Sequence, residues 1–327
     1  MSIPDYQELF LRNYGVFTDK EQDRIRTSKV LIIGCGGIGG TVAIVLARSG
    51  VSRFILVEFD NYGFSNMNRQ IACFTDTLGR NKAEVIREQI MKINPDAQVE
   101  VYPELLNHER ISELIPRVDV VFPAADDLAF SVIVFREAQR LGVPALLIFP
   151  SGTWANVCIL MPDSPPVEDI EGVPKLGSYE ELNDMLAIRK YKFGTYFYVP
   201  FADWRIDYYR SFIEEDSSPT HIAPSVWLCS SLGSLEVLKL LSGKWKPVAS
   251  PSYWNITANS IRINRIGGLN LQTLLVWQRK IMWRLFQTRL SPILEWAQEI
   301  WWKLFIAWGH FRERRGVRPD ADSSYIP

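Results

Sequence analysis

Between residues 29 and 150, short apolar runs alternate with longer amphipathic segments. The apolar runs, which predict strands, lie at residues 30–33, 54–57, 99–102, 119–122 and 145–149. The amphipathic segments, which have the spacing of helices, lie at residues 41–49, 81–93 and 129–141. Regular alternation of strands and helices is typical of a parallel sheet that is covered by helices on both faces. We therefore expect an α/β fold with a doubly wound, mainly parallel sheet.

The segments outside this core carry weaker or different patterns. Residues 1–28 are polar and predict a helical segment, and residues 151–162 predict a strand that leaves the sheet. Residues 163–224 are rich in Pro, Gly, Asp and aromatic residues, with a helical pattern only near residues 179–188. Connections of this length are usually functional or partly disordered, and we expect a long loop or crossover insert here.

A buried helix at residues 225–243 and a hairpin at residues 253–266 return the chain to the main domain. A distinct tail follows. We therefore expect five parts: 1–28, 29–162, 163–224, 225–268 and 269–327.

The tail differs from the rest of the chain in composition. Six of the eleven tryptophans lie in residues 269–315, where eight basic residues accompany three acidic ones. Pro292 divides the tail into two predicted helices. In the second helix, apolar residues recur at helical spacing: Ile293, Trp296, Ile300, Trp301, Leu304 and Trp308.

Two interpretations of the tail remain open. No uncharged run reaches the roughly 20 residues that a transmembrane helix needs. The two helices either pack on their own domain or on a second copy of the chain, or they bind a membrane surface through residues 269–315.

Bulk composition narrows the class of protein. The chain is 47% hydrophobic and 22% charged, which is ordinary for a soluble enzyme, and its net charge of −1 creates no strong overall field for nucleic acid. Its four cysteines form no C-x-x-C pair, which argues against a disulfide framework and a tetrathiolate zinc site. The first ten residues lack the pattern of a signal peptide. We therefore expect a cytoplasmic protein, with the tail as a candidate contact to the inner face of a membrane.

The segment KVLIIGCGGIGG at residues 29–40 contains the first candidate site. It runs from an apolar strand into a predicted helix through a turn of four glycines: Gly34, Gly36, Gly37 and Gly39. Glycines let the backbone N–H groups of a helix N-terminus approach phosphates. Glu58 ends the next strand, and an acid about 20 residues after such a turn holds a ribose hydroxyl. This is the pattern of a Rossmann-like nucleotide site, and by itself it leaves redox and adenylation chemistry open.

The polar residues that follow favour adenylation. Asn66 and Arg69 lie just beyond Glu58, where an arginine can neutralise charge on phosphates. Lys82, at a predicted helix start, supplies a second cation. Asp126 follows strand 119–122 at the carboxyl edge of the sheet, where a carboxylate can hold Mg²⁺ together with phosphate oxygens. The structural alternative for Asp126 is a helix N-cap.

Taken together, these motifs resemble those of the ThiF/MoeB/HesA family of adenylating enzymes, relatives of the ubiquitin-activating enzymes. The resemblance covers residues 8–162 and 220–266. It rests on ordered motifs: Gly34-x-Gly36-Gly37-x-Gly39, Ser65-Asn66-x-x-Arg69-Gln70, Gly79-x-x-Lys82, Ile93-Asn94-Pro95 and Asp126. The resemblance implies ATP and Mg²⁺ as cofactors, and transfer of AMP to a carboxylate with release of pyrophosphate.

Motif position also implies roles for individual residues. Glu58 would bind the ribose of ATP, and Asp126 would hold the metal. The phosphates would be bound by Asn66, Arg69 and Lys82.

Arg12 matches an arginine that dimers of the family lend to the neighbouring active site, so a homodimer is implied as well. The chain departs from the family pattern in having Glu58 where Asp is usual, Pro123 where an acid often precedes the metal-binding Asp, and Asp127 where Asn is usual. Residues 163–224 match no motif of the family, although the resemblance implies that this region helps to receive the substrate.

A cysteine that accepts the acyl group is a further option, because some members of the family use one. Cys229 precedes the predicted helix at residues 230–241, and a helix start lowers the pKa of a thiol. The alternative is a buried, packed thiol.

Three functions remain open at this stage. The first is an adenylyltransferase that activates the C-terminus of a small ubiquitin-like or sulfur-carrier protein, or of a ribosomal peptide. The second is a tRNA-modifying adenylating dehydratase, which would need a basic surface; the insert at 163–224 offers none, although the tail could. The third is a nucleotide-binding module without turnover, anchored by its tail.

Overall fold

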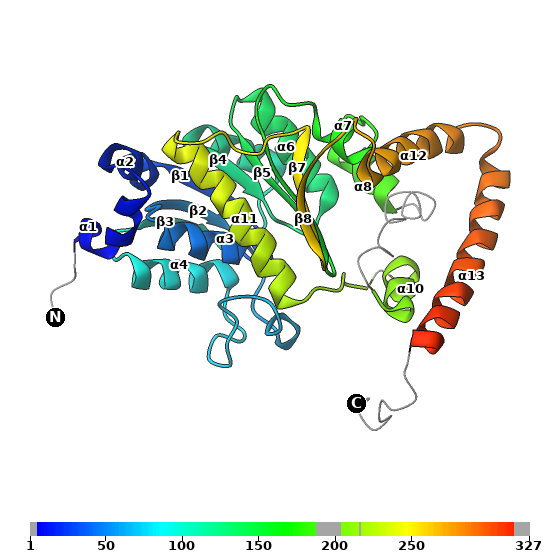
Figure 1. The fold of residues 1–327 in the computed structure, drawn as a ribbon, viewed down its shortest axis with the longest axis horizontal. Helices are drawn as coiled ribbons and strands as arrows, with labels where there is room; N and C mark the ends of the chain where they lie inside the picture. The colour runs from blue at the N-terminus through cyan, green and yellow to red at the C-terminus, as the bar shows by residue number, and fades with distance from the viewer. Residues whose placement is uncertain (1–4, 188–203, 216, 317–327) are drawn as a thin grey trace.

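An eight-stranded sheet organises the protein, in the order β3-β2-β1-β4-β5-β6-β7-β8 (Figure 1). The structure is a computed structural model that describes residues 5–187, 204–215 and 217–316. The strands are β1 Lys29–Ile33, β2 Arg53–Val57, β3 Gln98–Tyr102, β4 Val120–Pro123, β5 Ala145–Ser151, β6 Trp154–Leu160, β7 Ser252–Thr257 and β8 Ser260–Arg265. Strands β1 to β5 pair in parallel, and β6, β7 and β8 extend the sheet in antiparallel fashion. The expected α/β fold is therefore confirmed.

Helices cover both faces of this sheet. The main-domain helices are α1 Tyr6–Leu9, α2 Asp19–Thr27, α3 Gly37–Arg48, α4 Lys82–Ile93, α5 His108–Leu114, α6 Leu128–Arg140 and α11 Ala223–Ser242, with short 3-10 turns η1 Leu11–Gly15, η2 Phe64–Asn66 and η3 Ile115–Arg117. Helices α3, α4 and α11 share one buried cluster with the sheet, and α5 and α6 share another on the opposite face.

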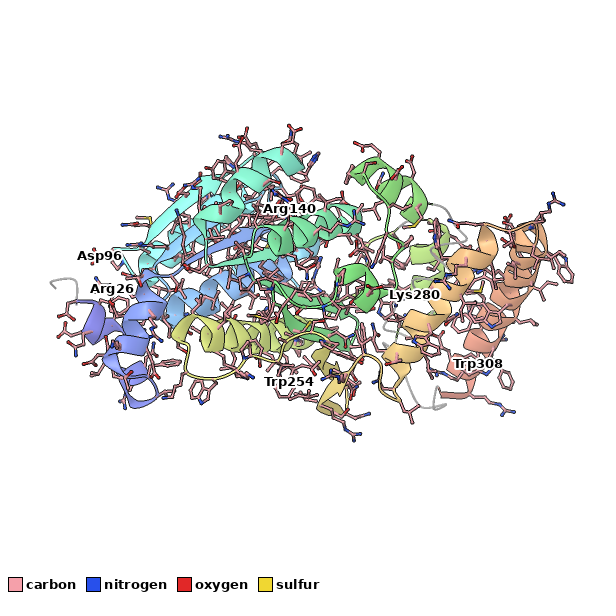
Figure 2. All side chains as sticks on the ribbon, turned by 90° about the horizontal axis from the view of Figure 1, so that it is seen from above. Arg26, Asp96, Arg140, Trp254, Lys280 and Trp308 are labelled. Carbon is pink, nitrogen blue, oxygen red and sulfur yellow. The ribbon has the colours of Figure 1, made fainter. Side chains whose placement is uncertain are left out.

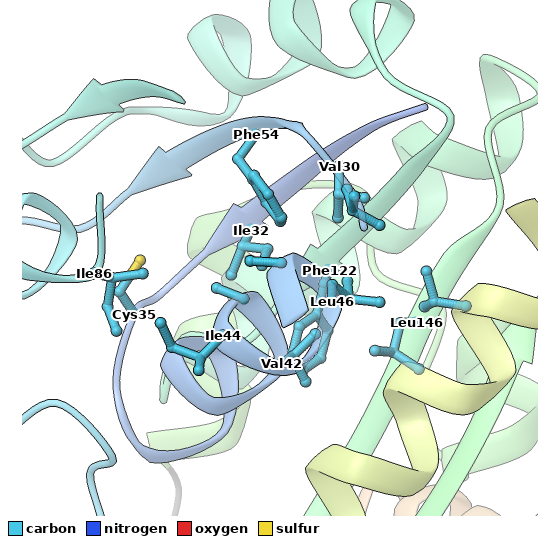
Figure 3. Packing of buried hydrophobic residues seen from close by; sticks show 14 of the residues in the cluster. Val30, Ile32, Cys35, Val42, Ile44, Leu46, Phe54, Ile86, Phe122 and Leu146 are labelled. Carbon is cyan, nitrogen blue, oxygen red and sulfur yellow. The ribbon is translucent and has the colours of Figure 1, made fainter. Parts of the chain in front are cut away.

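Alternate residues of β1 show why the sheet needs both layers. Val30 and Ile32 belong to the cluster under α3, whereas Leu31 and Ile33 belong to the cluster under α6. Figure 3 shows Val30 and Ile32 within the cluster that also contains Val42, Ile44 and Leu46 of α3. Because side chains alternate along a strand, a fully apolar run is stable only when both faces are covered. The short apolar runs of the sequence therefore mark the central strands.

Two sequence predictions about the main domain are wrong in detail. The segment 151–162 does not leave the sheet, because the chain turns at Gly152 (φ +58°) and β6 pairs with β5 along its length. Residues 155–160 are buried throughout, which holds β6 inside the sheet. Helix α3 begins at Gly37 rather than at residue 41, because the glycines of the turn themselves form its first turn.

The insert contains more helix than its sequence predicts. Helices α7 Val167–Glu171, α8 Tyr179–Ala187 and α10 Ile206–Glu214 are present, and only α8 was expected; α5 was likewise not expected. These helices are short, so their periodicity is weak, and packing against larger elements stabilises them. Residue 188 of the predicted helix lies outside the described residues, as do parts of the segments 1–28, 163–224 and 269–327.

The tail forms two helices, as the sequence predicts, α12 Leu271–Phe286 and α13 Ser291–Gly316. Lys280 of α12 pairs with Asp169 of α7 at 2.8 Å. Trp302 of α13 is only 2% exposed, and its indole N–H donates to Glu214 of α10 at 2.8 Å. Figure 2 shows Lys280 and, farther out, Trp308 on the side of the molecule opposite to Arg26. One side of each tail helix thus packs on the protein's own insert.

Within the described part of the chain, none of the helices combines the length and the apolar character that crossing a bilayer requires.

Candidate active site

The strand order reverses between β1 and β4. After β1 the chain passes outward to β2 and β3, and then returns to β4 on the other side of β1. In open α/β sheets, ligands bind at the carboxyl ends of the strands at such a reversal. Gly34 N–H donates to the Val57 carbonyl at 2.8 Å, and Ala124 N–H donates to the Ile33 carbonyl at 2.7 Å. The glycine turn therefore lies between the segments that follow β2 and β4.

The four glycines of the turn divide into two kinds. A Cβ at Gly34 would lie 2.7 Å from the Ala124 carbonyl oxygen, and a Cβ at Gly39 would lie 1.8 Å from the Gly34 carbonyl oxygen. A Cβ at Gly36 would have room, 3.6 Å from the side chain of Gln70, and a Cβ at Gly37 would make a tight contact of 3.3 Å with the side chain of Val226 rather than with backbone. The fold itself requires Gly34 and Gly39. The absence of side chains at Gly36 and Gly37 instead keeps the N-terminus of α3 accessible to an anion.

Glu58 stabilises the glycine turn through hydrogen bonds of its carboxylate. Its Oε2 accepts the Cys35 N–H at 2.9 Å, its Oε1 accepts the Asp60 N–H at 2.9 Å, and the residue is 7% exposed. Each carboxylate oxygen has a second lone pair, so Glu58 can still accept a hydroxyl from a nucleotide. The structure thus adds a positional role to the ribose contact that the sequence predicts.

Lys82 lies at the first position of α4 and pairs with an acid that sequence reasoning missed. Its Nζ is 3.0 Å from Oδ2 of Asp60, and the Lys82 side chain is 9% exposed against 53% for Asp60. The Lys82 N–H also donates to the Asp60 carbonyl at 3.0 Å. A carboxylate two residues after Glu58 was visible in the sequence, but the contact with Lys82 depends on the path of the chain between β2 and α4.

Asn66 and Arg69 lie on the turn that follows β2. The Asn66 side-chain oxygen accepts the Gly63 N–H at 3.0 Å, and Arg69 Nη1 donates to the Ser65 carbonyl at 2.9 Å. A Cβ at Gly37 would lie 3.6 Å from Cγ of Arg69, so the arginine stem borders the start of α3. Arg69 is therefore a cation beside the open helix N-terminus.

His221 lies near Arg69, where the insert returns to α11. Its carbonyl accepts the Asn68 side-chain amide at 3.1 Å. Burial, and then the charge of Arg69, lowers the pKa of His221 to about 4. The backbone of His221 also forms a bridge with Gly152, so two backbone contacts hold this residue in place, and both contacts are independent of its neutral imidazole.

Asp126 and Asp127 follow β4 and have different surroundings. Asp127 is the N-cap of α6, since its Oδ1 accepts the Phe130 N–H at 2.9 Å. Asp126 is exposed, and no described residue donates a hydrogen bond to its carboxylate or pairs with it. The N-cap that was the alternative role for Asp126 is thus taken by Asp127, which leaves Asp126 available to a ligand.

A magnesium ion fits this edge only as part of a nucleotide complex. Among the described residues, no group of three or more His, Cys, Asp or Glu side chains is arranged to hold a metal. Mg²⁺ is commonly bound through one or two carboxylates, with substrate phosphates and water as the remaining ligands. The exposed carboxylate of Asp126 follows Ala124 and Ala125, whose backbone lies against Gly34 of the turn, and this placement is compatible with that mode.

Arg12 does not join the other site residues within one chain. It is an exposed residue of η1, and Asn13 beside it donates to the Ser49 carbonyl at the C-terminal end of α3 at 2.9 Å. The glycine turn is at the other end of α3, about 18 Å away for twelve residues of helix. Only a second copy of the chain could bring an Arg12 to this site.

The four cysteines are free and buried. The interpretation that Cys229 lies at a helix start is wrong, because α11 begins six residues earlier, at Ala223. Burial raises the pKa of Cys229 to about 12 and raises the pKa values of Cys35, Cys73 and Cys158 as well. The thiolate form is therefore disfavoured at these positions, and packing explains the four cysteines.

Comparison with known sequences identifies relatives of this arrangement. The chain is 30% identical over 141 residues to the sulfur carrier protein ThiS adenylyltransferase of Escherichia coli, which covers 43% of this chain and 56% of the relative. It is 28% identical over 151 residues to the tRNA threonylcarbamoyladenosine dehydratase of Haemophilus influenzae, covering 46% and 58%. The matched segments thus span little more than half the length of these relatives.

Solved structures share the fold. The crystal structure of E. coli MccB with MccA-N7isoASN superposes with a TM-score of 0.60 at 22% identity, over 80% of this chain and 72% of that one. The structure of E. coli MccB with ATP gives 0.59 at 23% identity, over 80% and 73%. At this identity the likeness concerns the fold alone.

A sequence model of the ThiF family matches residues 10–271, a range that includes the glycine turn, Arg69, Lys82, Asp126 and α11. The chain belongs to the ThiF family.

Proposed function

We propose that this protein is an ATP-dependent adenylyltransferase that activates a carboxylate as an acyl adenylate and releases pyrophosphate. The observation that carries the proposal is the convergence of three anion-binding features at the β1/β4 reversal: the open N-terminus of α3, Arg69 and Lys82. The exposed Asp126 borders the same turn. Relatives named as adenylyltransferases support the same chemistry.

In the proposed reaction, a carboxylate oxygen attacks the α-phosphorus of ATP, and the bond from that phosphorus to the bridging oxygen of pyrophosphate breaks. Lys82 exchanges its contact with Asp60 for a phosphate oxygen, and Arg69 neutralises the charge that develops at phosphorus. Glu58 holds the turn and accepts a ribose hydroxyl. Asp126 would hold Mg²⁺, which supplies charge neutralisation to the departing pyrophosphate when it is bound. Positioning and electrostatics provide most of the acceleration in such transfers.

We propose that the active form is a homodimer with Arg12 acting across the interface. Helix α11 has twenty residues and is therefore about 30 Å long. Its N-terminal end lies at the site, because the Trp227 indole N–H donates to the Arg69 carbonyl at 2.9 Å. Its C-terminal end lies beside η1, because Lys244 donates to the Val16 carbonyl.

The outer surface of α11 supports this arrangement. Trp227, Leu228 and Leu235 are each 43% exposed along the helix. Antiparallel packing of two such helices about a two-fold axis would place Arg12 of each copy at the Arg69 end of its partner. That geometry would complete both sites at once.

The favoured substrate is the C-terminal carboxylate of a small carrier protein or peptide. The named relative that acts on the sulfur carrier ThiS supports this class. The relative named as a tRNA dehydratase keeps tRNA as the second candidate. We place the reaction in the cytoplasm, where the four free cysteines would stay reduced. A module without turnover is a weaker fit, because Arg69, Lys82 and Asp126 are all retained.

We also propose that the tail binds an anionic membrane surface. One side of α13 is apolar and at least 40% exposed at each of six positions: Ile293, Trp296, Ile300, Leu304, Trp308 and Phe311. Trp301, which the sequence grouped with them, is instead half-buried in the cluster with Trp302. Exposed basic residues flank the apolar side, and Arg312 and Arg315 stack over the rings of Trp308 and Phe311 at 5.4 and 4.4 Å. Aromatic anchors with basic neighbours suit an interfacial helix.

Flotation with vesicles of phosphatidylcholine and phosphatidylserine tests the tail. Leu304→Asp should reduce flotation several-fold, whereas Leu105→Asp should not, although Leu105 is similarly exposed at 75% against 65%. Equal flotation of both variants, or no flotation of the wild type, would exclude a membrane role for this surface.

ATP–pyrophosphate exchange tests the catalytic proposal. Exchange is measured with total tRNA, with a fraction of small proteins and peptides, and with buffer alone as the blank, and one of the first two should stimulate it. Lys82→Ala should lower exchange by about 10²-fold or more, the scale of losing a charge that stabilises the transition state. Lys92→Ala is the matched control, because Lys92 is an exposed lysine at the other end of α4. Exchange that survives in Lys82→Ala would overturn the mechanism.

A further inference from the structure

One carboxylate connects the insert to the loop that carries Asp126. Oδ2 of Asp127 accepts the hydroxyl of Tyr179 at 2.8 Å, while its Oδ1 caps α6 through the Phe130 N–H at 2.9 Å. Tyr179 is the first residue of α8, fifty-two positions along the chain from Asp127. Both oxygens of Asp127 are therefore used to hold its backbone in one place.

Helix α8, which begins with Tyr179, is held in place by hydrogen bonds at its start and by buried apolar side chains. Ser178 and Glu181 close the start of α8, since the Glu181 N–H donates to the Ser178 hydroxyl at 3.1 Å and the Gly177 N–H donates to the Glu181 carboxylate at 2.8 Å. Leu182 and Met185 are 0% and 3% exposed in the cluster that α8 shares with α6. The position of the Tyr179 hydroxyl is thus set by the packing of α8 on the main domain.

Asp126 has no such attachment of its own. Its side chain is exposed, so its orientation follows from the backbone on either side. Before Asp126, the backbone is held at Ala124, whose N–H donates to the Ile33 carbonyl at 2.7 Å. After Asp126, it is held at Asp127, whose side chain caps α6. Removal of the Tyr179 hydroxyl would loosen the second attachment and leave the first intact.

From this geometry we infer that Tyr179 is a positioning residue for Asp126, and that it couples the substrate insert to the metal-binding edge of the site. The inference rests on the proposed function. A carboxylate held in place binds Mg²⁺·ATP without an ordering cost, whereas a mobile one must be ordered first. Contact between a substrate and the insert would then be transmitted to the pyrophosphate end of ATP through one hydrogen bond.

The test is the magnesium dependence of the Tyr179→Phe variant, which keeps the ring and removes the hydroxyl. The Mg²⁺ concentration for half-maximal exchange should rise about 5-fold, the size expected for one lost hydrogen bond. Calorimetric affinity for Mg²⁺·ATP should fall by a similar factor, with little change for ATP in EDTA. Tyr208→Phe is the control, because Tyr208 lies on α10 and is 57% exposed.

A double-mutant cycle with Asp127→Ser separates positioning from general stability. Serine retains one oxygen for the N-cap, whereas the side-chain amide of asparagine could still donate to the Tyr179 hydroxyl oxygen. If the two residues act through one contact, the double variant should be no more impaired than the worse single variant. Additive effects, or a Tyr179→Phe protein that melts earlier but has unchanged Mg²⁺ affinity, would overturn the inference.

A failure of the proposed adenylation activity would give results that differ from a failure of the inference about Tyr179. A wild type that binds Mg²⁺·ATP but performs no exchange with any substrate pool would refute adenylation, while the calorimetric comparison would still decide the role of Tyr179. A wild type that binds no nucleotide would refute both.

Discussion

The two kinds of glycine in the turn give a sharp prediction, because one substitution should damage the fold and the other should damage nucleotide binding. In Gly39→Ala the new Cβ would lie 1.8 Å from the Gly34 carbonyl oxygen, a backbone atom that cannot rotate away. Overpacking of a core costs about 1–3 kcal/mol, and a clash with backbone belongs at or above the upper end. For a domain of this size we expect the melting temperature to fall by roughly 6–12 °C.

In Gly36→Ala the new Cβ would lie 3.6 Å from the nearest atom, the side-chain nitrogen of Gln70. Alanine is a poorer N-cap than glycine, so a cost of about 1 kcal/mol and a shift of roughly 2–4 °C are expected. The methyl group would nevertheless cover the N-terminus of α3, and ATP affinity should fall about 10-fold or more, since the helix N–H groups would lose their approach to phosphate.

Thermal melts and ATP calorimetry on both variants test whether Gly39 is required for folding and Gly36 for ATP binding. A Gly39→Ala protein with the melting temperature of the wild type would contradict the packing argument. A Gly36→Ala protein that binds ATP as the wild type does would show that phosphate is not bound at the N-terminus of α3.

The remaining predictions concern charge, dimerisation and protonation. Asp60→Asn should tighten ATP binding several-fold in calorimetry, because Lys82 would lose a competing carboxylate; weaker binding would contradict this competition. Mixing of Arg12→Ala and Lys82→Ala proteins should restore exchange, because a mixed dimer holds one complete site; no recovery after verified subunit exchange would count against Arg12 acting in trans. Cys229→Ala should retain full exchange, and iodoacetamide at pH 8 should not label Cys229 in the folded protein, since its pKa is about 12. The folded state lowers the pKa of His221 to about 4, so the stability that its neutral form supports is present above pH 6.5 and is lost as the pH falls toward 4. Denaturant titrations should show a shallower loss over that range for His221→Gln.

Local sequence patterns were sufficient for the parts of the site that lie on one continuous segment. The run from Lys29 to Gly40 encodes a strand, a turn and a helix start within twelve residues, so its structure hardly depends on the rest of the chain. Glu58 and Lys82 were likewise recognisable, because each stands at the end of a periodic segment. Parallel strands bring their carboxyl ends to one edge, and this general rule already predicted that Asp126 would lie near the turn.

Contacts between distant segments could not be read in this way. The pairing of Lys82 with Asp60 and that of Tyr179 with Asp127 depend on how loops and the insert pack, and no periodicity reports on either. The same holds for β6, where the sequence suggested a departure from the sheet and a turn at Gly152 produced an antiparallel neighbour.

The tail shows most clearly the difference between what local sequence patterns predict and what packing decides. Its helical spacing and its break near Pro292 followed from the sequence alone, because both are local properties of the backbone. Packing against the aromatic cluster on α10 decided which side of α13 is buried. Trp302 packs into that cluster, whereas Trp296 and Trp308 are exposed. Likewise, the sequence by itself determined that Arg12 is a candidate site residue, but only the tertiary structure showed that it lies at the far end of α3. Sequence patterns encode local conformation and the burial each element requires, whereas the choice among competing partners is made by packing across the whole chain.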